Sequence, residues 1–114
     1  MSLHSRIDLL DGCGEPCGFI EQHKISGHRE WVVFAVASEP VQIPDLPPIF
    51  TLHDISTDGA VSIIDSSGDD SYSVLWRNTD SVPVSHYLST GHALWLVPDD
   101  EPAEIQIMIY EGTR

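Results

Sequence analysis

Two cysteines and two histidines lie close together near the start of the 114-residue chain. They are Cys13, Cys17, His23 and His28, and their spacing reads C-x3-C-x5-H-x4-H. Thiolates and imidazoles are the usual zinc ligands, and four of them complete a closed structural site. This cluster is therefore the candidate metal site with the most specific spacing. The alternative is a turn with two reduced thiols next to a strand that carries one histidine.

The spacing of these four residues resembles that of a zinc knuckle. It departs from the knuckle by one residue in each of the first two gaps and by ending in His rather than Cys. Residues 18–25 also read as a strand, which would carry His23 away from Cys13 and Cys17. We therefore expect the protein to hold no stoichiometric zinc and no other cofactor, with zinc kept as the alternative.

An oxygen-rich segment, Asp-Ser-Ser-Gly-Asp-Asp, spans residues 65–70. Its carboxylates, from Asp65, Asp69 and Asp70, are candidate calcium ligands, since calcium takes about six to eight oxygens. An EF-hand would also need flanking helices and a closing Glu, and neither flank reads as helical. An acidic hairpin turn explains the same residues, because Asp and Ser bond to the nearby backbone in turns.

Six histidines make an acid–base site conceivable, but the sequence contains no H-x-H, G-x-S-x-G, P-loop, G-x-G-x-x-G or H-E-x-x-H motif. His86 lies in phase with the apolar residues of its strand, where a hydrogen-bonded core histidine is the usual interpretation. The sequence thus favours a protein that is not an enzyme. A pocket that holds two or more of His53, His86 and His92 would favour an enzyme or a ligand-binding protein.

The elements that must position these residues read as short strands. Turn-forming residues recur roughly every ten positions, which is typical of a sandwich or barrel. Residues 31–37 are apolar on both faces, which predicts a central strand buried on both sides. Residues 39–48 hold four prolines and predict a crossover between two sheets. Period-two alternation places Tyr72, Val74 and Trp76 on one face of a later strand.

These patterns predict one all-β domain over residues 1–114. We expect an antiparallel β-sandwich, immunoglobulin-like or jelly-roll-like, with about seven to nine short strands and little or no helix. The immunoglobulin arrangement of Cys, Trp and Cys on facing strands is absent, so the topology stays open between the two.

The chain is strongly acidic, with 18 acidic residues, five basic residues and a net charge of −13. This charge disfavours direct binding to nucleic acid or to an anionic membrane, and it favours a protein partner with a basic surface. No apolar run approaches the ~18 residues of a membrane span. Residues 1–10 carry charge and lack an apolar signal region, so we expect an intracellular protein or one assembled into a particle.

The absence of an enzyme motif favours a non-catalytic protein-interaction module, such as a small viral or microbial structural, accessory or inhibitory protein. The alternatives are a small β-barrel enzyme or ligand-binding protein with a His/carboxylate site, and an acidic inhibitor that mimics nucleic acid. Exposed strand edges also favour a homo-oligomer. Loop tips and outward aromatics are the expected contact points. The candidate partner-binding residues are Asp69, Asp70, Asp99, Asp100, Glu101, Tyr87 and Tyr110.

Overall fold

The computed structural model describes residues 3–25, 28–44, 46–68, 72–78, 80–99 and 101–112. The prediction of an all-β chain is confirmed, since these ranges contain ten strands and no helix, a slightly higher strand count than expected. No helix that could span a membrane occurs among them. The strands are β1 (Leu3–Leu10), β2 (Pro16–Ile25), β3 (His28–Ala37), β4 (Val41–Ile43), β5 (Ile49–Thr57), β6 (Val61–Ser66), β7 (Tyr72–Arg77), β8 (Val84–Tyr87), β9 (Ala93–Pro98) and β10 (Ala103–Glu111).

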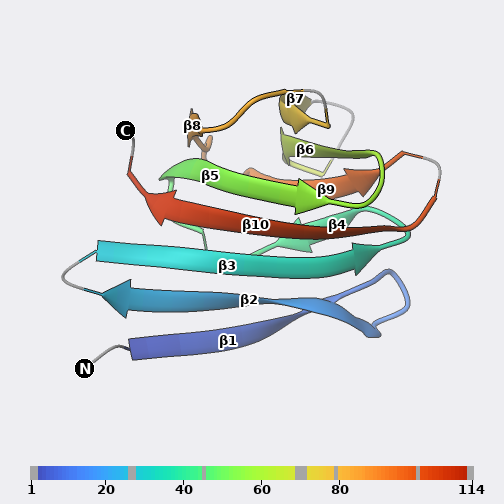
Figure 1. The fold of residues 1–114 in the computed structure, drawn as a ribbon, viewed down its shortest axis with the longest axis horizontal. Coiled ribbons are helices and arrows are strands. Elements are labelled where there is room, and N and C mark those ends of the chain that lie inside the picture. Colours follow the sequence, from blue (N-terminus) through green and yellow to red (C-terminus); the bar gives the residue numbers. More distant parts are fainter. Residues whose placement is uncertain are drawn as a thin grey trace.

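The strands form two antiparallel sheets that pack as a sandwich. One sheet has six strands in the order β1-β2-β3-β10-β5-β8, and the other has four in the order β4-β9-β6-β7. Figure 1 shows β1, β2, β3, β10 and β5 stacked from bottom to top. The strands β1 and β2 thus extend the larger sheet as an N-terminal hairpin.

The other eight strands are wound as four nested pairs. Strand β3 pairs with β10 and β5 with β8 in the larger sheet, while β4 pairs with β9 and β6 with β7 in the smaller one. Successive pairs therefore alternate between the two sheets. This is the double Greek key of an eight-stranded jelly roll, so the topology is jelly-roll-like rather than immunoglobulin-like.

Alternation within the strands builds the core between the sheets. On β3, Trp31 and Val33 are buried, whereas Val32 and Phe34 are half-buried and Val36 is 47% exposed. The strand is central, as its sequence predicts, but the prediction that both its faces are buried is wrong. The second sheet covers one side of β3, and the other side lies on the outside of the sandwich.

The proline-rich segment crosses from one sheet to the other, as predicted. It differs from the expectation by containing a short strand, β4, which pairs with β9. Val41 and Ile43 are buried and Gln42 is exposed, so three residues alternate as in any half-buried strand. Pro44 then ends the strand because proline lacks the N–H that a ladder needs.

A bulge in the β6·β7 pair changes which side chains of β7 face inward. Ile63 lies opposite Trp76, but Ile64 lies opposite Val74, which leaves Leu75 as the extra residue. Trp76 is 5% exposed, whereas Tyr72 is 58% and Val74 is 38% exposed. The prediction that Tyr72, Val74 and Trp76 share one face is therefore wrong, because the bulge reverses the alternation.

Candidate functional site

A buried carboxylate lies at the inner face of the smaller sheet. Alternation along β6 turns Val61, Ile63 and Asp65 toward the core, and Asp65 is 4% exposed. A carboxylate in an apolar interior is costly unless other groups bond to it. The groups that bond to the Asp65 carboxylate therefore determine whether this part of the fold is stable.

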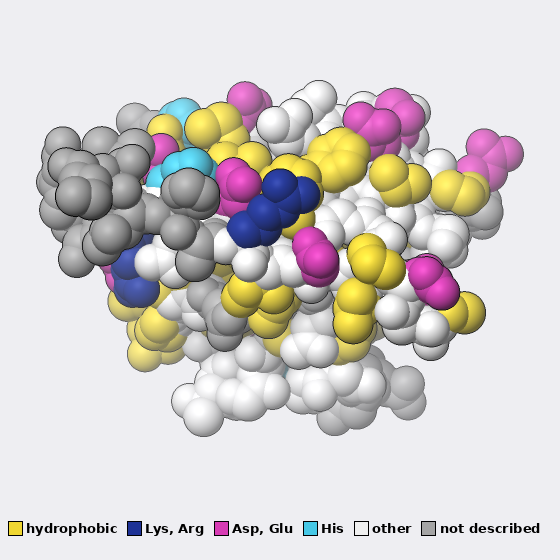
Figure 2. Space-filling view, turned by 90° about the horizontal axis from the view of Figure 1, so that it is seen from below, with side chains coloured by type: hydrophobic (Ala, Val, Ile, Leu, Met, Phe, Trp, Pro, Cys, Tyr) yellow, Lys and Arg dark blue, Asp and Glu magenta, His cyan; other side chains and the backbone are white. Residues whose placement is uncertain are grey.

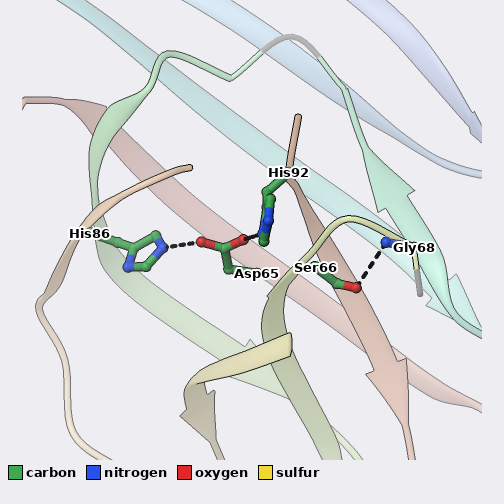
Figure 3. Close-up of polar contacts among 5 residues, drawn as sticks. All are labelled: Asp65, Ser66, Gly68, His86 and His92. Atoms are coloured by element: carbon green, nitrogen blue, oxygen red, sulfur yellow. Dashed lines mark hydrogen bonds and ion pairs between the residues drawn. The ribbon is translucent and has the colours of Figure 1, made fainter. Parts of the chain in front are cut away.

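Two imidazoles bond to the Asp65 carboxylate, one at each oxygen (Figure 3). The Nε2 atom of His86 lies 2.6 Å from Oδ2, and the Nδ1 atom of His92 lies 2.7 Å from Oδ1. With Asp65 ionised, an N–H of each ring donates to the carboxylate. His86 is on β8 in the larger sheet, so this cluster of Asp65, His86 and His92 joins the two sheets.

Local structure directs both histidines toward Asp65. His86 lies opposite Phe50 in the β5·β8 ladder, and the two rings are in contact with centroids 5.8 Å apart. His92 follows a tight turn in which its N–H donates to the Ser89 carbonyl at 3.0 Å. Gly91 has a φ of 83° in that turn, a left-handed conformation that glycine adopts without strain.

This arrangement fits a structural clamp better than a catalytic site. An Asp–His pair can orient a general base, but here both carboxylate oxygens are already bonded to histidines. His53 is not part of the cluster, because it stacks on Tyr110 with ring centroids 4.5 Å apart. The prediction that His86 is hydrogen-bonded is confirmed, although its ring is half-buried rather than part of the core. The sequence marks Asp65 as a candidate calcium ligand and does not show it as the partner of two histidines, although it continues the alternation of Val61 and Ile63.

Of the three candidate calcium ligands, the structure describes Asp65 alone. Asp65 faces the core and bonds to two histidines, so its carboxylate does not point into the following turn. Asp69 and Asp70 lie outside the described residues. Within the part of the chain that the structure describes, no group of three or more His, Cys, Asp or Glu side chains is placed to hold a metal ion.

The candidate zinc ligands are spread along the β1–β2 hairpin. Cys13 is exposed in the turn and Cys17 is half-buried at the start of β2. His23 lies six residues further along β2, about 20 Å away at ~3.3 Å per residue, and its Nε2 atom is near Glu21. The side chain of His28 is outside the described part. The hairpin therefore does not bring His23 beside the cysteines.

The Cys17 thiol is expected to react more slowly than the Cys13 thiol. Burial raises its pKa, and the negative charges of Asp11 and Glu39 raise it further. Since the thiolate is the nucleophile, we expect iodoacetamide at pH 8 to alkylate Cys17 several-fold more slowly than the exposed Cys13. Peptide mapping by mass spectrometry measures both rates in one sample. The rates should become similar in urea, and equal rates in the folded protein would contradict the prediction.

Asp99 and Glu101 lie at the end of the smaller sheet that is opposite to the C-terminal end of β6. Strands β6 and β9 are antiparallel, with Val61 opposite Pro98 and Ser66 opposite Ala93. Ser67 and Gly68 therefore lie at one end of the sheet, and the turn with Asp99 and Glu101 lies at the other. Both of these residues are exposed, and Asp100 lies outside the described residues.

The two tyrosines that the sequence marks for partner binding lie on the larger sheet. Tyr87 is 68% exposed, and it follows the inward-facing His86 in β8, so it points outward. Tyr110 is half-buried, because it stacks on His53. Tyr87 is therefore the more accessible of the two.

An apolar groove of about 400 Å³ lies on the outer face of the smaller sheet. Its central row runs across three strands, with Val74 of β7 opposite Ile64 of β6 and Ile64 opposite Trp95 of β9. Polar side chains flank this row. The remaining lining residues are Pro40, Ser62, Ser66, Gly68, Tyr72, Arg77 and Val97.

One polar atom beside this groove is left without a partner. The indole Nε1 of Trp95 is buried and makes no hydrogen bond to the described residues. Trp95 alternates along β9 with Leu94 and Leu96, which are fully buried, so its outward position follows from period-two alternation. The groove itself was not, because it depends on the bulge that turns Tyr72 and Val74 outward.

The geometry thus offers an internal clamp and an external groove, separated by strand β6, in which Asp65 faces inward and Ser66 outward. No protein-family profile, curated protein or solved structure matches this chain, so its function is inferred from these two features.

Proposed function

We propose that the chain is a non-catalytic recognition module that binds its ligand in the groove of the smaller sheet. The supporting observation is the row of the exposed Val74 and the half-buried Ile64 and Trp95, with Tyr72 and Arg77 beside it. Contiguous apolar surface with a polar rim is typical of interaction sites on small proteins. Tyrosine, tryptophan and arginine are also the residues that contribute most to binding energy at such sites.

The composition of the groove favours binding over catalysis. Its described lining holds no His, Cys, Asp or Glu, the side chains that most often transfer protons or attack a substrate. The His and Asp side chains of the clamp lie on the other side of β6. The clamp contributes by holding the two sheets together, which keeps the groove rigid and lowers the entropic cost of binding.

A protein with a basic surface is the second candidate ligand. The net charge of −13 accelerates encounter with such a partner. Asp58, Asp99 and Glu101 line a separate groove at the end of the sandwich where β9 ends. Figure 2 shows the face on the β1 side, where acidic side chains are scattered rather than gathered in a stripe. A nucleic-acid mimic, which needs such a stripe, gains no support from this face.

Chemical-shift mapping tests the proposal. The full chain, labelled with ¹⁵N, is titrated with three probes: neutral oligosaccharides, a lysine-rich peptide and single-stranded DNA. We expect at least one probe to shift the amide signals of β6, β7 and β9, and Tyr72→Ala to weaken that binding about tenfold. The matched control is Tyr87→Ala, which removes an equally exposed tyrosine from the other sheet.

Two results would contradict the proposed function. One is the absence of binding by any of the three probes. The other is binding that shifts Asp58, Asp99 and Glu101 but leaves β6, β7 and β9 unchanged, which would assign recognition to the acidic end instead.

A further inference from the structure

We infer that the groove of the smaller sheet binds a neutral oligosaccharide. This inference rests on the proposed function and adds the chemical class of the ligand. It follows from the hydrogen-bond donors that the groove leaves unused, from its aromatic side chains and from the charge of the protein.

One hydrogen-bond donor beside the groove lacks an acceptor in the described part of the chain. The indole N–H of Trp95 has no acceptor among the described residues. Buried donors are nearly always paired, so an unpaired one needs an explanation. A ligand oxygen would supply the missing acceptor. Trp95 lines the groove and is half-buried, but its Nε1 atom is buried, so the indole would have to rotate on ligand binding for this N–H to reach a ligand oxygen.

Arg77 provides a second unused donor at the other side of the groove. Arg6 and Arg29 form ion pairs with Glu21 and Glu111, but the Arg77 guanidinium has no carboxylate partner in the described structure. Its backbone lies opposite Ser62 of β6, and its exposed side chain lines the groove. A free guanidinium in a chain with 18 acidic residues is available to donate to ligand oxygens.

The apolar side chains of the groove match the apolar face of a sugar ring. Tyr72 is 58% exposed and lies opposite Ser66, so an aromatic ring and a hydroxyl are adjacent. One face of a pyranose ring is apolar and its edge carries hydroxyls. Such a ring can pack on Tyr72 and Val74 while its hydroxyls bond to Trp95 and Arg77. Apolar lining with a few placed polar groups is the usual composition of small-ligand sites.

The charge of the protein favours a neutral ligand over a charged one. A net charge of −13 opposes the approach of anionic sugars and nucleic acids. A basic peptide would be attracted to the protein as a whole, but in this groove it would meet Arg77 and find no Asp or Glu among the described lining residues. A neutral ligand with many oxygens is not repelled by the net negative charge of the protein, and it places no positive charge beside Arg77. The groove volume, about 400 Å³, also lies in the usual range for small-ligand sites.

The test titrates the full chain with neutral hexasaccharides of glucose, mannose, xylose and galactose, and with a galacturonate hexamer as the anionic control. We expect at least one neutral sugar to shift β6, β7 and β9, and the anionic sugar to bind about tenfold more weakly than the best neutral sugar. Trp95→Phe keeps an aromatic ring but removes the N–H. We expect it to weaken sugar binding about fivefold, and because the lost donor has no acceptor among the described residues, any fall in melting temperature reflects only the smaller ring.

Three outcomes separate this inference from the proposed function. If the lysine-rich peptide or DNA shifts β6, β7 and β9 and no sugar does, the groove is a binding site but the carbohydrate inference is wrong. If Trp95→Phe binds sugar as tightly as the unchanged protein, the role of the unpaired N–H is wrong. If no probe binds, both the inference and the proposed function fail.

Discussion

Replacing Gly18 with alanine is expected to lower the free energy of unfolding by about 3 kcal/mol or more. Gly18 lies directly opposite Ala35 in the β2·β3 ladder. A Cβ atom at this position would overlap the carbonyl oxygen of Phe34 and lie 2.6 Å from the Cα of Ala35. Both are backbone atoms of a central strand, so no side-chain rotation relieves the clash. The strands must separate locally and lose ladder hydrogen bonds.

Urea denaturation followed by far-ultraviolet circular dichroism measures this effect, and Gly12→Ala is the matched control. A Cβ at Gly12 meets only the carboxylate of Glu39, the flexible end of a long side chain. The control loses at most the hydrogen bond from the Gly12 N–H to that carboxylate, about 1 kcal/mol. Similar losses for Gly12→Ala and Gly18→Ala would contradict the close approach of β2 and β3.

The sequence predicts those features of the fold that depend on local patterns. Ile105, Ile107 and Ile109 alternate in the sequence and are all buried on β10. The proline-rich segment predicts the crossover because proline lacks the N–H that a strand ladder needs, whatever its neighbours are in the fold. These features need no knowledge of which strands pair.

Features that depend on pairing over long distances were not predictable in this way. Asp65 belongs by composition to an acidic turn, and its partner His86 comes from a strand in the other sheet. The bulge at Leu75 follows from the register between β6 and β7, and no single-strand pattern reports that register. Both parts of the candidate site therefore depend on contacts that are set when the sheets assemble.

Removing the Asp65 carboxylate is expected to cost about 3 kcal/mol of stability. Asp65→Ala deletes two charge-assisted hydrogen bonds and leaves the half-buried rings of His86 and His92 without their acceptor. Asp65→Asn keeps one oxygen acceptor, so we expect an intermediate loss. The control is Asp99→Ala, an exposed aspartate at the other end of the same sheet, with an expected change within about 0.5 kcal/mol.

A double-mutant cycle separates the clamp from the general effect of removing a buried side chain. If Asp65 and His86 stabilise each other, the loss in the Asp65→Ala/His86→Ala protein is smaller than the sum of the two single losses by about 1–2 kcal/mol. Additive losses, or an Asp65→Ala protein as stable as Asp99→Ala, would contradict the clamp. Since the clamp joins β6 to β8, its loss should also accelerate amide exchange in both strands before the rest of the sandwich opens. Ligand binding in the groove would weaken with it, because β6 forms the floor of that groove as well as the inner wall that carries Asp65.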